Sequence, residues 1–112
     1  AGLWCNDAKL KKQIEKAAKE TGERVWELPL WEDHRDYMRA KHADLHNSAP
    51  ARGAHPIQGA AFLSFFVDKE IPWAHLDIAG TAYGDGSAPY LRKGGYGFPT
   101  RLLVQWVRSR AG

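Results

Sequence analysis

The feature that most constrains this chain is the stretch of residues 73–82, where a run of β-favouring residues gives way abruptly to small ones. Such a pattern predicts a buried strand whose carboxyl end lets another group come close. Ligands of open α/β sheets bind beyond the carboxyl ends of the strands. Ala79, Gly80 and Ala82 are therefore the candidate lining of a pocket.

Helical and extended patterns alternate along the rest of the chain. A capping pair, Asn6-Asp7, precedes an amphipathic helix that Thr21-Gly22 ends. The other expected elements are a strand over residues 23–30, a helix over 31–38, a helix opening at His55-Pro56, a flexible or tight-turning loop over 83–97 and an amphipathic last helix over 99–110. The helix after Pro56 carries apolar or small residues on most sides, so we expect it to be largely buried. Its Ser64 is expected to bond back to the backbone.

Size and charge exclude several classes of protein. With 112 residues and 44% hydrophobic residues, the chain can form one small domain with one core. The excess of 16 basic over 13 acidic residues is small and scattered, so nucleic acid is not an expected partner. The single cysteine, Cys5, fits a reducing compartment, and no apolar run is long enough to span a membrane.

Two histidine patterns could carry chemistry. His42 and His46 are spaced i, i+4, but a zinc protease of the HExxH type would need a glutamate where Ala43 stands. A mononuclear metal site at this pair stays open as an alternative. His75 and Asp77 share one face of the predicted strand, and we expect a structural role for both.

Several separated segments together resemble one family. The chain is similar to the C-terminal end of the leucyl aminopeptidase family, cytosolic two-metal enzymes that remove N-terminal amino acids. The resemblance rests on AGLWCND, ERVWELPLWEDH, ADLHNS, AAFLSFFV, WAHLDIAGTA, PYLRKG and GFPTRLLVQW, which follow the family's order. It implies an α/β fold: a three-layer-like fragment of a catalytic domain, with helices packed on a small mixed sheet.

The resemblance also divides what this chain would supply from what it would not. The family's Asn-Thr-Asp-Ala-Glu-Gly-Arg signature is absent, which implies that residues 1–112 are the C-terminal part of the catalytic domain. The two divalent ions, zinc or manganese, would be held in the full enzyme, and we expect no metal ligand, catalytic residue or activity in this chain alone. Its contribution would be scaffold and part of the substrate side-chain pocket. Ala79 and Ala82 match pocket positions, and Ala82 stands where some relatives carry methionine, which implies a wider pocket.

The same resemblance implies a cytoplasmic enzyme that acts on peptides, assembles as a homo-oligomer, typically a hexamer, and needs no membrane. A second hypothesis is a non-catalytic binding module, because lysine and arginine are in surplus in the first and last predicted helices. Such a weakly basic surface could contact DNA.

Overall fold

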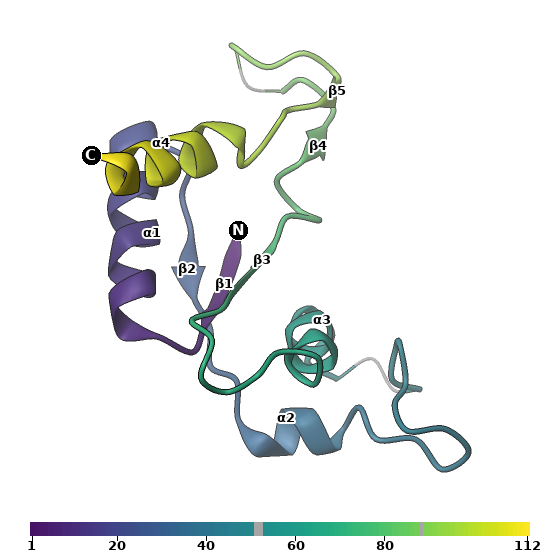
Figure 1. Cartoon of the computed structure of the whole chain (residues 1–112). Helices are drawn as coiled ribbons and strands as arrows, with labels where there is room; N and C mark the ends of the chain where they lie inside the picture. Colours follow the sequence, from purple (N-terminus) through teal and green to yellow (C-terminus); the bar gives the residue numbers. More distant parts are fainter. Residues whose placement is uncertain (51–52, 88) are drawn as a thin grey trace.

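A three-stranded sheet lies at the centre of the computed structural model, which describes residues 1–50, 53–87 and 89–112. The middle strand is β1 (Gly2–Cys5), which runs parallel to β2 (Trp26–Glu27) and antiparallel to β3 (Ala74–Asp77). Figure 1 shows the amino terminus inside this sheet, with the helices around it.

The buried strand is β1, which corrects the expectation for residues 73–82. Leu3 and Trp4 are fully buried on opposite faces of β1, whereas all four residues of β3 are only partly buried. Close packing around Trp4 explains Gly2: a Cβ at Gly2 would lie 2.9 Å from the Trp4 ring. Among the described residues β3 pairs only with β1, so it is an edge strand.

Helix α1 (Ala8–Thr21) begins and ends where the sequence predicts. The Asp7 side chain accepts a hydrogen bond from the Leu10 amide at 2.6 Å, and Gly22 ends the helix in the left-handed conformation with φ 74°. The inner face of α1 buries Ile14, Ala17 and Ala18.

Helix α4 (Thr100–Ala111) packs against α1 and lies across one end of it in Figure 1. Its start is capped by Glu23, a buried carboxylate 79 residues away, which accepts hydrogen bonds from the Leu102 amide at 2.8 Å and from Arg101 Nε at 3.2 Å. The apolar face that docks is narrower than predicted. Leu102 is fully buried, whereas Leu103 is 44% exposed.

Helices α2 (Glu32–Asp36) and α3 (His55–Ser64) pack on each other below the sheet in Figure 1. The fully buried Met38 follows α2, and the Arg35 guanidinium lies 4.4 Å above the Phe65 ring. Helix α3 is not buried on most sides, because Leu63 is 42% exposed and Phe66, just beyond the helix, is 69% exposed. The bond predicted for Ser64 is confirmed: its hydroxyl donates to the Ala61 carbonyl at 2.7 Å.

A small hairpin stands where the sequence predicts a loop. Strands β4 (Tyr83–Gly84) and β5 (Gly94–Gly95) pair antiparallel, and Ala88, which belongs to the predicted loop, lies outside the described residues. The predicted strand over residues 23–30 is reduced to the two residues of β2.

The molecule is flat, with extents of 46 × 37 × 18 Å. Helix α1 contacts β1, and α3 contacts β3. The described residues thus form an α/β fold in which four helices surround a small mixed sheet and an antiparallel hairpin, which confirms the predicted fold class. None of the helices in the described part of the chain is long and apolar enough to cross a membrane.

Candidate functional site

The end of β3 forms a tight turn that holds the three candidate pocket residues. The Asp77 carboxylate accepts a hydrogen bond from the Ala79 amide at 3.0 Å. The Ile78 carbonyl accepts from the amides of Thr81 and Ala82, both at 2.9 Å. The Ala82 carbonyl in turn accepts from the Tyr96 amide at 2.8 Å, which ties the turn to the end of β5. The backbone of this turn is therefore held from both sides.

Small side chains leave the outer surface of the turn open. Ala79 and Gly80 are exposed and Ala82 is partly buried. A Cβ built on Gly80 would meet nothing within 4 Å, so contacts within this chain do not require glycine there. Hollows of the described surface, such as those beside α1 and beside the loop after α2, are lined by other residues. The turn is thus an open, rigid ledge rather than the wall of a closed pocket.

His75 fills the space between β1, β3 and α3. Its ring centroid lies 5.6 Å from that of Trp4 and 6.2 Å from that of Trp73. A Cβ on Gly59 of α3 would lie 3.6 Å from His75 Nε2. Burial lowers the pKa of His75, and the nearby Asp77 charge opposes that shift. Asp77 is bound to the turn and His75 lies between aromatic rings, and the structural role expected for both stays a prediction.

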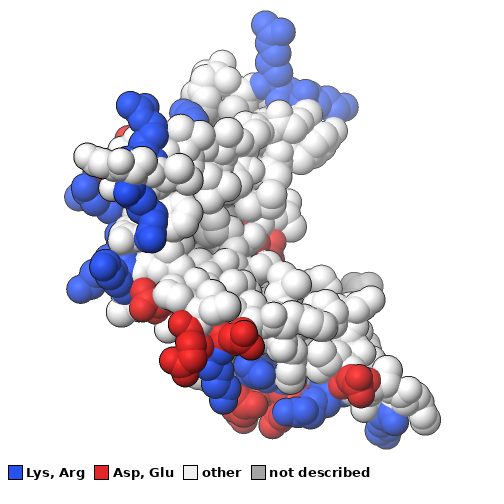
Figure 2. Space-filling view, in the orientation of Figure 1, with Lys and Arg blue, Asp and Glu red and all other residues white. Residues whose placement is uncertain are grey.

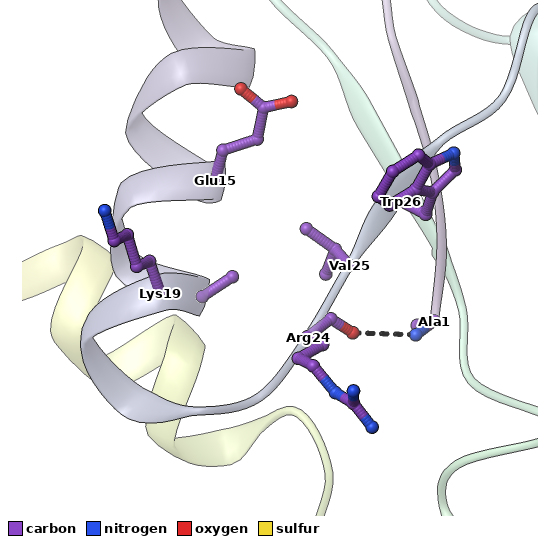
Figure 3. A pocket seen from close by; sticks show the side chains of 7 residues that line it. Ala1, Glu15, Lys19, Arg24, Val25 and Trp26 are labelled. Atoms are coloured by element: carbon purple, nitrogen blue, oxygen red, sulfur yellow. Dashed lines mark hydrogen bonds between the residues drawn. The ribbon is translucent and has the colours of Figure 1, made fainter.

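Between α1 and β2 the surface forms a hollow of about 570 Å³, drawn in Figure 3. Glu15 and Lys19 come from α1, and Val25 and Trp26 come from the β2 side. Trp26 is 80% exposed, so the hollow has an uncovered aromatic edge beside the charged side chains of Glu15, Lys19 and Arg24. Sequence reasoning missed it because its walls come from two segments, and the apolar members of residues 23–30 were assigned to a longer strand.

The histidine pair of the HExxH-like pattern is not on a helix. Arg39 and Leu45 form an isolated antiparallel bridge that closes a loop around His42, and His46 follows the bridge. Within the described ranges, no group of three or more His, Cys, Asp or Glu side chains could hold a metal ion. The donor set of these residues therefore does not fit a two-metal centre.

Charge is distributed unevenly over the molecule. Helices α1 and α4 carry eight of the 16 basic residues but two of the 13 acidic ones. Figure 2 shows blue side chains gathered over these helices, and red ones mainly over the lower part of the molecule. The two helices therefore present a basic surface that the small net charge of the whole chain conceals.

Comparisons with known proteins point to one family. Residues 1–104 match the family model described as the cytosol aminopeptidase family, catalytic domain. A probable cytosol aminopeptidase of Synechococcus sp. (strain WH7803) is 41% identical over 99% of this chain and 22% of its own length.

Two solved structures show the same arrangement of elements. A cytosol aminopeptidase from Coxiella burnetii superimposes with a TM-score of 0.85 at 33% identity, covering 97% of this chain and 23% of its own. The bottromycin maturation enzyme BotP, in complex with Mn, superimposes with a TM-score of 0.90 at 37% identity, covering 99% of this chain and 24% of its own. The chain thus spans less than a quarter of the length of these proteins.

Proposed function

The chain belongs to the cytosol aminopeptidase family, and on that premise we propose that residues 1–112 form the C-terminal part of a metal-dependent aminopeptidase catalytic domain. In this proposal the whole enzyme acts in the cytoplasm, removes N-terminal amino acids from peptides and works as a homo-oligomer, a hexamer by the family resemblance. The observation that carries the proposal is the match of one family model to residues 1–104.

The role proposed for this segment is to support the active centre and to form part of the pocket for the first side chain of the substrate. The open ledge of Ala79, Gly80 and Ala82 supports it, because its backbone is held by hydrogen bonds while its outer surface is free. Small side chains there leave room for a bulky substrate group. Ala82 in particular favours a wide pocket.

The metal ions of the proposed enzyme, zinc or manganese, would be held by residues other than those described. The described residues do not provide the dense oxygen ligands that a two-metal centre needs. A bound pair of ions supplies an activated water for attack on the peptide carbonyl. This chain's own residues would contribute binding and orientation of the substrate side chain.

The first experiment assays the purified 112-residue chain with a leucine chromogenic amide and manganese. We expect no turnover above a blank without protein, because the ligand set is lacking. Turnover that a chelator abolishes would contradict the division of roles proposed for this segment.

The second experiment places this chain in a complete enzyme. Residues 1–112 replace the matching segment of the Synechococcus relative, which is 41% identical over 111 residues. We expect the chimera to hydrolyse amino-acid amides. In this chimera, Ala82→Met narrows the space above the ledge. We expect it to lower kcat/KM for amides of large amino acids by about tenfold, relative to kcat/KM for alanine amide. A chimera that folds and assembles but has no activity would count against the proposal.

The basic surface of α1 and α4 favours a second candidate, a binding module for a polyanion such as duplex DNA. Each phosphate contact releases counterions, so binding should weaken steeply with salt. A gel shift at low salt that Lys12→Glu/Lys16→Glu abolishes would support this function. If no gel shift occurs at low salt, this second candidate function is excluded.

A further inference from the structure

The loop after α2 borders an open hollow with a basic lining. Its volume is about 650 Å³, and the side chains around it include Tyr37, Arg39, Lys41, His42, His46 and Pro50. Volumes of this order are typical of sites that take small molecules. None of the described residues that line the hollow is acidic.

Backbone hydrogen bonds hold the ends of this loop together. The His46 amide donates to the carbonyl of the buried Met38 at 2.7 Å, and Arg39 bridges to Leu45. Because its ends are joined, the loop presents the side chains between them from a fixed base.

Arg39 is oriented by two contacts outside the hollow. Its Nε donates to the Asp36 carboxylate at 2.9 Å, and its guanidinium carbon lies 5.4 Å from the centre of the Phe65 ring. Its side chain is still 59% exposed, so further N–H groups can reach a ligand. The guanidinium is thus held at the rim of the hollow, and some of its N–H groups are left for a ligand.

The other polar groups of the lining are available for a ligand. In the described part of the chain, neither Lys41 nor His42 nor His46 forms an ion pair or a side-chain hydrogen bond. An ammonium group and two imidazoles beside a guanidinium are suitable donors to the oxygens of a multiply charged anion. A metal ion is a poorer fit, because only two imidazoles would bind it and two cations lie beside them.

Apolar groups complete the lining. The Tyr37 ring is 42% exposed, and Pro50 lies on the same hollow. A bare phosphate would occupy a small part of 650 Å³. An anion joined to an apolar group would use both kinds of surface.

We propose that this hollow beside the loop after α2 is a binding site for a phosphomonoester, with Arg39, Lys41, His42 and His46 around the phosphate and Tyr37 against its apolar group. The site is separate from the Ala79–Ala82 ledge and does not rest on the function proposed for that ledge. Phosphate esters carry close to two negative charges at neutral pH, which matches the lining.

Titration of the 112-residue chain with phenyl phosphate tests this site. Calorimetry gives the affinity, and ¹⁵N-labelled protein reports where the ligand binds. We expect saturable binding with a Kd of about 1 mM or tighter, with amide shifts centred on residues 37–46. Inorganic phosphate should bind about fivefold more weakly, because it makes no contact with Tyr37.

Matched variants distinguish binding at this hollow from non-specific attraction to basic side chains elsewhere. Lys41→Gln/His42→Gln changes two exposed side chains and should weaken the binding of phenyl phosphate about tenfold. Lys12→Gln/Lys16→Gln removes two charges from α1 and should leave the affinity unchanged. Tyr37→Ala should lower the affinity for phenyl phosphate to that for inorganic phosphate.

Three results would overturn the proposal: no saturable binding of either phosphate, an equal loss in the α1 variant, or shifts centred on α1. Stoichiometric zinc binding that His42→Gln abolishes, without phosphate binding, would replace it by a metal site.

Discussion

The α1–α4 region, which comprises those two helices and β1, closes a core of its own, whereas the α2–α3 region does not. The first buries a cluster of Leu3, Ile14, Ala17, Ala18 and Leu102 and is tied across by side-chain hydrogen bonds. The second joins its helices through Arg35 over Phe65 and a buried Met38, and leaves Phe66 69% exposed.

The difference shows how one short chain distributes its apolar surface. Burial of large side chains stabilises the α1–α4 region by itself. The α2–α3 region buries Met38 and small side chains such as Ala60 and Ala61, but it covers Phe65 only in part and leaves Phe66 exposed. We therefore expect global stability to depend on the first region and local opening to begin in the second.

The largest effect should come from Leu102→Ala. Leu102 is fully buried between α1 and α4, and removal of a buried leucine side chain costs about 3 kcal/mol of unfolding free energy. Urea unfolding followed by circular dichroism measures the loss. The matched change Leu103→Ala, at a position that is 44% exposed, should cost less than about 1 kcal/mol. Equal losses would mean that α4 does not dock as described.

A smaller loss is expected for Glu23→Ala. Its carboxylate is 5% exposed and holds the Leu102 amide at 2.8 Å. Without it a buried N–H group loses its partner, which costs about 2 kcal/mol. Glu15→Ala, at an exposed position of α1, is the control and should stay within about 0.5 kcal/mol. A neutral result for Glu23→Ala in the same urea experiment would show that water replaces the cap.

In the other region Phe65→Leu should act locally. The substitution keeps an apolar side chain but removes the ring under Arg35 and Arg39, a loss of about 1 kcal/mol. Hydrogen exchange should speed up at amides of α2 and residues 37–39, with little change in α1. If exchange in α1 rose equally, the two regions would unfold as one unit.

The smallest effect concerns pH at the contact between the regions. Burial lowers the pKa of His75 in the folded chain, so the unfolded chain binds a proton more readily. This contribution to stability is therefore complete above the ordinary histidine pKa of about 6.5 and is lost as pH falls below it. His75→Gln should flatten the dependence of the urea midpoint between about pH 7 and 5. His55→Gln, at the exposed start of α3, is the matched control; an equal change there would contradict the assignment.

Local signals allowed the sequence to predict one part of this structure well. Asp7 and Gly22 cap a helix that they adjoin in the sequence, so the ends of α1 were predictable. Contacts between distant segments carry no such signal. Nothing near Glu23 indicates that it caps a helix 79 residues later, and the β-favouring run of residues 73–78 did not distinguish an edge strand from a buried one.

The position of the candidate residues was predictable from the sequence, but the shape of the turn that holds them was not. The small residues Ala79, Gly80 and Ala82 do lie together after a strand, as their types predict. The open ledge that they form depends on hydrogen bonds from Asp77 and to Tyr96, which the pattern does not reveal. Their role in substrate binding remains a prediction.

The Glu23 cap also has a consequence for synthesis of the chain. Helix α1 leaves the ribosome before α4, and its apolar stripe is covered only once the twelve residues of α4 have emerged. A nascent chain therefore carries α1 without this cover while the residues between the two helices are made, which is the kind of surface that chaperones hold.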